Sequence, residues 1–183
     1  YYVFFKYSVN VFWFDDFDPF PYFLEHWITT TSLSAKLQLL FAPNNEHRMV
    51  FGKLATLFIY ATSNQLNFTH LHVIGALFTV GTLYLIWNLW KKSDLPAWSF
   101  LPVPFLLFQL QYHMVFLWAI CSLQHQPAVF FVCLSMFLLG KRKFLMAIVA
   151  GICASFAMSS GIFVWVGGAA ILISRREWKI VIL

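Results

Sequence analysis

Long apolar runs separated by short polar loops dominate the pattern of this chain. A full membrane span needs roughly 20 apolar residues, so the run at 1–14 is interpreted as the outer part of a first span. The last two runs predict a tight hairpin of short helices that turns at Ser159-Ser160-Gly161. The complete set of predicted spans is 1–14, 69–90, 98–117, 127–139, 144–158 and 161–174.

Residues 15–68 follow a different pattern, in which polar positions interrupt the apolar ones. The segment begins with Asp15-Asp16-Phe17-Asp18-Pro19-Phe20-Pro21, whose carboxylates and prolines end a helix. Amphipathic helices are predicted from Leu33 to Phe41 and from Glu46 to Tyr60, with a break at Pro43-Asn44-Asn45. Such helices usually lie along a membrane surface. We therefore expect an outer loop at 15–68 that contains interfacial helices.

Basic residues cluster beside the apolar runs, at Lys91-Lys92, at 141–143 and at Arg175-Arg176 with Lys179. Cytoplasmic loops of membrane proteins carry an excess of Lys and Arg. All three clusters fall on one side of the predicted topology, and the 15–68 loop falls on the other. The net charge of +5 is thereby explained without nucleic-acid binding, and contact with membrane lipid headgroups is expected.

Composition supports the same fold class. The chain is 61% hydrophobic and only 10% charged, which is more apolar surface than a soluble domain of this length can bury. Cys121, Cys133 and Cys153 lie in apolar runs without a CxxC pair, so no disulfide framework is expected. We predict an all-α, polytopic transmembrane helical bundle that forms a single domain over 1–183. Because the chain starts without Met and stops after a basic loop, we expect it to be a portion of a longer protein.

Asp15 and Asp16 are the candidate catalytic residues. A charge next to the hydrocarbon boundary is costly unless it is solvated, paired or metal-bound. A carboxylate there could deprotonate an acceptor hydroxyl or bind a divalent cation. The metal requirement is unknown, and Asp15 and Asp16 are its ligands if there is one. The alternative is a polar loop whose acids lie in water and cap the following helix.

Glu46, His47, Arg48 and Lys53 form the candidate substrate-binding group. They could line one shallow cavity together with the Asp15 loop. Arg48 could clamp a phosphate through its bidentate fork, with Lys53 as a supporting charge. The alternative is an interfacial helix whose basic side chains extend to lipid headgroups.

The order of these features resembles the integral-membrane glycosyltransferases of the GT-C class, and in particular a group of bacterial polytopic membrane proteins. Asp15-Asp16 directly follows the first span, and Asn45-Glu46-His47-Arg48 follows two short amphipathic segments. Further likeness comes from Gln111-Tyr112 with Phe116-Leu117-Trp118, and from the segment between Ser155 and Trp165. His113 departs from the pattern, because an acid is expected there.

The resemblance implies transfer of a sugar from a polyprenyl-phosphate carrier to an acceptor on the outer face of the membrane. Asp15 or Asp16 would be the acid in the first outer loop. It also implies a bacterial inner (plasma) membrane, with the 15–68 loop outside. Two other functions are open: a non-catalytic subunit or scaffold that binds other membrane subunits, and a transporter. A transporter needs polar groups near the midplane, and only Gln109, Gln111 and His113 qualify.

Overall fold

The computed structural model describes residues 2–176, and within them the regular structure is helical. Lys179 of the third basic cluster, and any span that follows it, lie outside the described residues. The elements in chain order are α1 Tyr2–Tyr7, η1 Phe14–Phe17, η2 Asp18–Tyr22, α2 Phe23–Thr29, α3 Leu33–Phe41, α4 Val50–Ser63, α5 Phe68–Trp90, η3 Ala97–Phe100, α6 Pro102–Leu107, η4 Leu110–Tyr112, α7 His113–Leu117, α8 Ala119–Gly140, α9 Phe144–Ala157, η5 Ser159–Ile162 and α10 Phe163–Ser174.

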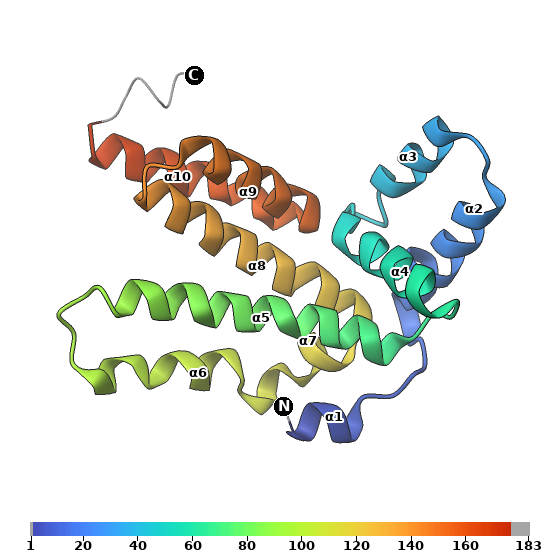
Figure 1. Ribbon diagram of the computed structural model, residues 1–183, viewed down its shortest axis with the longest axis horizontal. Helices are drawn as coiled ribbons and strands as arrows, with labels where there is room; N and C mark the ends of the chain where they lie inside the picture. Colours follow the sequence, from blue (N-terminus) through green and yellow to red (C-terminus); the bar gives the residue numbers. More distant parts are fainter. Residues whose placement is uncertain (1, 177–183) are drawn as a thin grey trace.

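The longer helices lie side by side, and α2, α3 and α4 gather at one end of them (Figure 1). The α5–α6 connection, the α8–α9 connection and the end of α10 lie at the opposite end (Figure 1). These segments carry Lys91-Lys92, residues 141–143 and Arg175-Arg176. The grouping of basic segments at one end therefore agrees with the predicted topology, and the acidic loop lies near the other end.

Three stretches of the described chain are long and apolar enough to cross a membrane: Phe68–Trp90, Ala97–Leu117 and Ala119–Gly140. The helices α9 and α10 contain 14 and 12 residues. At about 1.5 Å per residue, each is shorter than the ~30 Å hydrocarbon core. The predicted turn at Ser159-Ser160-Gly161 is present, because η5, Ser159–Ile162, connects these two short helices.

The central pair, α5 and α8, packs closely where a small residue allows it. A methyl group added at Gly75 would overlap the Ser122 hydroxyl oxygen. Nearby, the Thr79 hydroxyl donates to Gln126 Oε1 at 2.8 Å, and Gln126 Nε2 donates to the Val115 carbonyl at 2.6 Å. Gln126 therefore joins α5, α7 and α8 through its two amide atoms.

Three of the predicted spans differ from the observed helices. The helix α8 begins at Ala119 rather than at 127. The residues between the predicted spans 98–117 and 127–139, apart from Trp118, therefore belong to α8 and do not form a loop. Pro127, which suggested a helix start, lies inside α8; interior prolines are tolerated in membrane helices. The run at 1–14 forms a six-residue helix and then a non-helical segment. The stretch Ala97–Leu117 is broken between α6 and η4, at Phe108 and Gln109.

Candidate functional site

The two adjacent acids, Asp15 and Asp16, have different environments. Both lie in η1, directly after the non-helical segment that follows α1. Asp15 is exposed, whereas Asp16 is only 1% exposed. Asp16 Oδ2 accepts a hydrogen bond from the Trp13 backbone N–H at 3.0 Å, and Oδ1 accepts one from the Ile120 N–H at 2.8 Å. Each carboxylate oxygen of Asp16 therefore accepts a hydrogen bond from a backbone donor.

Asp16 caps the start of α8 from a distant part of the sequence. The residue at the usual capping position, Trp118, makes no side-chain cap hydrogen bond. The first N–H groups of a helix have no partner within the helix and favour a negative charge. Burial raises the pKa of Asp16 to about 6, although the Trp13 and Ile120 hydrogen bonds act in the opposite direction. This geometry assigns Asp16 a structural contact and leaves Asp15 as the accessible acid.

A compact turn presents Glu46 and His47. The backbone N–H of Asn44 donates to the His47 carbonyl at 2.6 Å, and the His47 N–H donates back at 3.0 Å. Asn45, at the tip, has a left-handed φ of 51°, which asparagine tolerates better than most residues. The predicted helix from Glu46 therefore starts later, at Val50, because residues 44–47 close this turn first.

Asp15 and the turn residues line one cavity of about 560 Å³. The cavity joins segments that are far apart in the sequence: η1, the turn before α4, and the first turns of α8. Its lining residues are Asp15, Asn44, Asn45, Glu46, His47, Met49, Trp118, Ile120, Cys121 and Gln124. Asp15, Glu46 and His47 are thus brought together as predicted, whereas Asp16, Arg48 and Lys53 do not line this cavity.

His47 also contacts the α9–α10 turn. The Ser159 backbone N–H donates to His47 Nδ1 at 3.4 Å. This contact holds the imidazole of His47 beside the α9–α10 turn.

Lys53 is directed into the protein rather than to a substrate. Its side chain is only 4% exposed, and burial lowers the pKa of its ammonium group to about 8. The ammonium group donates to the carbonyls of Leu39, Leu40 and Ala42 at 2.9, 3.4 and 2.7 Å. These bonds match the number of hydrogens that an ammonium group has. Lys53 therefore satisfies the carbonyls at the C-terminal end of α3, where a positive charge is favourable.

Replacing Lys53 is expected to loosen the packing of α3 on α4. Lys53→Met keeps the apolar stem but leaves buried carbonyls without a donor, so the free energy of unfolding should fall by about 2–4 kcal/mol. Thermal unfolding in detergent micelles measures this loss. Lys92→Met, at an exposed position, is the control and should change stability by less than about 0.5 kcal/mol. Equal midpoints for the two variants would show that the Lys53 hydrogen bonds contribute nothing.

Arg48 is exposed at the protein surface. One guanidinium nitrogen, Nη1, donates to the Phe41 carbonyl at 3.3 Å, and the guanidinium carbon lies 5.8 Å from the centre of the Phe156 ring. A guanidinium group has several other N–H donors in a planar fork. Arg48 is therefore held near α3 and α9 and keeps donors that can reach a ligand.

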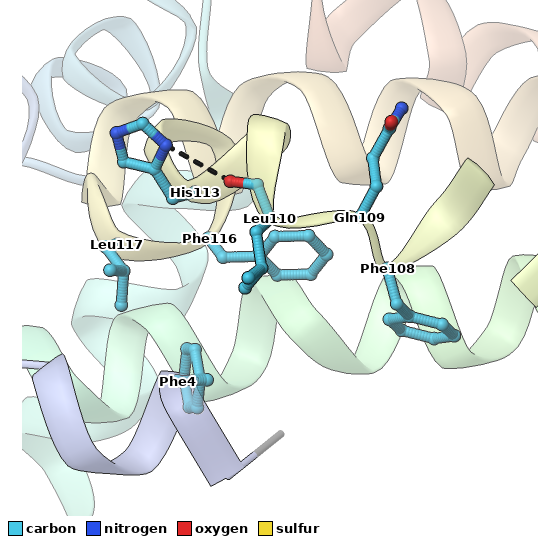
Figure 2. A pocket seen from close by; sticks show the side chains of 7 residues that line it. All are labelled: Phe4, Phe108, Gln109, Leu110, His113, Phe116 and Leu117. Atoms are coloured by element: carbon cyan, nitrogen blue, oxygen red, sulfur yellow. Dashed lines mark hydrogen bonds between the residues drawn. The ribbon is translucent and has the colours of Figure 1, made fainter. Parts of the chain in front are cut away.

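Gln109 and His113, near the break in Ala97–Leu117, line only a small pocket. Figure 2 shows the small pocket beside the break, where His113 Nδ1 donates to the Leu110 carbonyl at 3.2 Å. This pocket has a volume of about 70 Å³ and is lined by Phe4, Phe108, Gln109, Leu110, His113, Phe116 and Leu117. Most of these side chains are apolar, and the histidine is used in a local hydrogen bond.

No metal cluster is evident in the described part of the chain, where no three His, Cys, Asp or Glu side chains are grouped to hold an ion. The cavity also contains a residue that the sequence analysis did not select, Gln124. Its only sequence signal is a polar Gln124-His125-Gln126 group inside an apolar stretch. The group falls between the predicted spans 98–117 and 127–139, in a predicted connection.

The chain matches no protein-family model, no curated protein and no solved structure.

Proposed function

We propose that this chain is the membrane part of a glycosyltransferase that moves a sugar from a polyprenyl-phosphate carrier to an acceptor on the outer face of the membrane. The observation that carries the proposal is the cavity shared by Asp15, Glu46 and His47. The resemblance to the GT-C class and the three stretches long enough to cross a membrane support it.

The reaction needs a base, and Asp15 is the residue best suited to the role. Its carboxylate is exposed and lines the cavity, so an acceptor hydroxyl can reach it. Asp15 takes the hydroxyl proton as the acceptor oxygen bonds to the anomeric carbon. The bond from that carbon to the carrier phosphate breaks, and the phosphate leaves with the electron pair. Asp16 supports this step by fixing η1 against the start of α8.

The departing phosphate needs a positive charge close to the cavity. Arg48 directly follows His47, a cavity residue, and its remaining N–H donors suit a phosphate group. Lys53 donates its hydrogen bonds to carbonyls at the end of α3. In this proposal Lys53 therefore stabilises the fold around Arg48. A divalent cation is a candidate cofactor, and Asp15 would be a ligand for it.

The proposed orientation places the cavity outside the cytoplasm. The basic connections lie at the end of the bundle opposite α2, α3 and α4 (Figure 1). Lys and Arg favour the cytoplasmic side, so the α2–α4 end faces outward. In a bacterium this is the outer face of the inner (plasma) membrane, where polyprenyl-linked sugars are used by the enzymes that the chain resembles.

Asp15→Asn is expected to lower sugar transfer by about 100-fold or more, the usual contribution of a general base. The measurement uses purified protein in liposomes that contain polyprenyl phosphate charged with a radiolabelled hexose, and it follows release of the label from the lipid. Asp18→Asn is the matched control, because Asp18 is also an exposed acid of this loop but does not line the cavity. Full activity in Asp15→Asn would remove this acid from the mechanism.

A second function, a non-catalytic subunit of a membrane complex, is favoured by one observation. The most apolar part of Ala97–Leu117 has no residue buried within the described chain, although its helix is broken. Non-helical backbone at membrane depth is usually covered by protein or lines a water-filled cavity. Purification in mild detergent distinguishes the two functions: a stable partner that covers the Asp15 cavity would favour the subunit.

A further inference from the structure

Gln124 has a side chain whose polar group the protein leaves unused. It is only 5% exposed, and its Nε2 atom is buried without a hydrogen-bond partner in the described residues. Gln126, two residues along the same helix and equally buried, bonds through both amide atoms to Thr79 and Val115. A buried donor without an acceptor destabilises the folded protein. Ser122 Oγ also lacks a partner in the described residues, but it packs against Gly75, whereas Gln124 lines a cavity. An acceptor for Gln124 can therefore come from a partner outside this fold.

The position of Gln124 indicates where that partner binds. Gln124 lines the cavity that Asp15, Glu46 and His47 also line. The last torsion of a glutamine side chain is broad, so its amide can turn toward a ligand at little cost. A ligand in the cavity would therefore meet the amide of Gln124, the imidazole of His47 and the two carboxylates.

These groups restrict the chemistry of the ligand. A phosphate has acceptors for Gln124 and His47, but it would be repelled by the carboxylates of Asp15 and Glu46. An ammonium group would suit the carboxylates but has no acceptor for the Gln124 amide. A hydroxyl group both donates and accepts, so several hydroxyls on one ring satisfy both kinds of group. Trp118 lines the same cavity and offers an aromatic surface to the apolar face of such a ring.

We infer that this cavity is a binding site for an uncharged, polyhydroxylated ring, and that the Gln124 amide hydrogen-bonds one of its hydroxyls. The inference rests on the proposed function, since it assigns the cavity to the sugar and places the carrier phosphate outside it, toward Arg48. Gln124 is then a residue that selects among sugars by the position of a hydroxyl group.

The test compares Gln124→Leu with Gln126→Leu. Ligand-observed NMR measures binding of methyl glucoside, methyl mannoside and methyl galactoside to protein in lipid nanodiscs, with inorganic phosphate and methylamine as charged probes. We expect at least one glycoside to bind and both charged probes to fail. Gln124→Leu should weaken glycoside binding by about 10-fold or more, since a site built to bond a hydroxyl strongly depends on that bond.

Thermal unfolding of the same variants separates a binding role from a structural one. Gln124→Leu removes an unpartnered amide, so the midpoint without ligand should stay or rise. Gln126→Leu breaks two hydrogen bonds, and its midpoint should fall by about 5 °C. A fall of the same size in Gln124→Leu would show a structural glutamine and overturn the inference. Unchanged glycoside binding in Gln124→Leu, or no glycoside binding by the unmodified protein, would also overturn it.

The liposome assay distinguishes failure of this inference from failure of the proposed function. Transfer that persists at full rate in Gln124→Leu contradicts the sugar subsite and leaves the glycosyltransferase standing. Glycoside binding that depends on Gln124 in a protein without transfer activity supports the subsite and contradicts the enzyme.

Discussion

Asp16→Ala is expected to lower the free energy of unfolding by about 2–4 kcal/mol, because the backbone N–H groups of Trp13 and Ile120 lose their acceptor in a buried position. The first turn of α8 loses its cap at the same time. Since α8 packs against both α5 and α9, the effect should spread through the bundle. Thermal unfolding in detergent micelles measures the loss.

Asp15→Ala is the matched control for this loss, because the neighbouring acid is exposed. Its expected change in stability is within about 0.5 kcal/mol. Substitutions of the two adjacent acids should therefore have different effects: those at Asp16 reduce stability, whereas those at Asp15 reduce sugar transfer. A stable Asp16→Ala protein that unfolds like the unmodified one would contradict the assigned cap.

The pH dependence of stability gives an independent measure of Asp16. Its pKa is about 6 in the folded protein and 3.8 for an ordinary aspartate, so between these values the folded state binds more protons than the unfolded state. The free energy of unfolding therefore decreases as pH rises through this window, by up to about 3 kcal/mol from this group. Asp16→Asn should remove that part of the slope, which a comparison of unfolding midpoints at pH 4.5 and pH 7 would detect.

Local patterns predicted some elements of the fold directly. The amphipathic segment from Leu33 to Phe41 is α3, and Ser159-Ser160-Gly161 lies in the turn between α9 and α10. Both depend on residues that are near each other in the sequence, where hydrophobic period and turn chemistry act directly. The start of α8 was placed too late, because its cap comes from Asp16, more than a hundred residues away.

The candidate site was predicted only in part, for the same physical reason. Charge scarcity identified Asp15, Glu46 and His47, which line one cavity. The same criterion also selected Asp16 and Lys53, whose burial against backbone groups cannot be inferred from their neighbours in the sequence. Charge scarcity does not select Gln124, because its side-chain amide is neutral and lies in an apolar run. Its significance depends on a missing partner, and only the packed structure shows which polar atoms lack one.

Gly161 is the tightest point of the α9–α10 hairpin. It is buried in η5, and its N–H donates to the Met158 carbonyl at 2.9 Å. A Cβ atom at this position would overlap the backbone carbonyl of Ala154 and lie 3.0 Å from the Ser155 nitrogen. Both neighbours are main-chain atoms of α9, so a side-chain rotation cannot make room. Only glycine lets the turn approach the end of α9 this closely.

Gly161→Ala is therefore expected to lower the free energy of unfolding by about 3 kcal/mol, at the upper end of the range for overpacked sites. The displaced turn would also shift the Ser159 N–H away from His47 Nδ1, which links the hairpin to the cavity. Gly140→Ala is the matched control, since a Cβ there meets nothing within 4 Å and alanine favours the helix. Thermal unfolding of both variants, with glycoside binding measured below the transition, tests the two effects. Equal stability of the two variants would mean that α9 can move away from the turn at no cost.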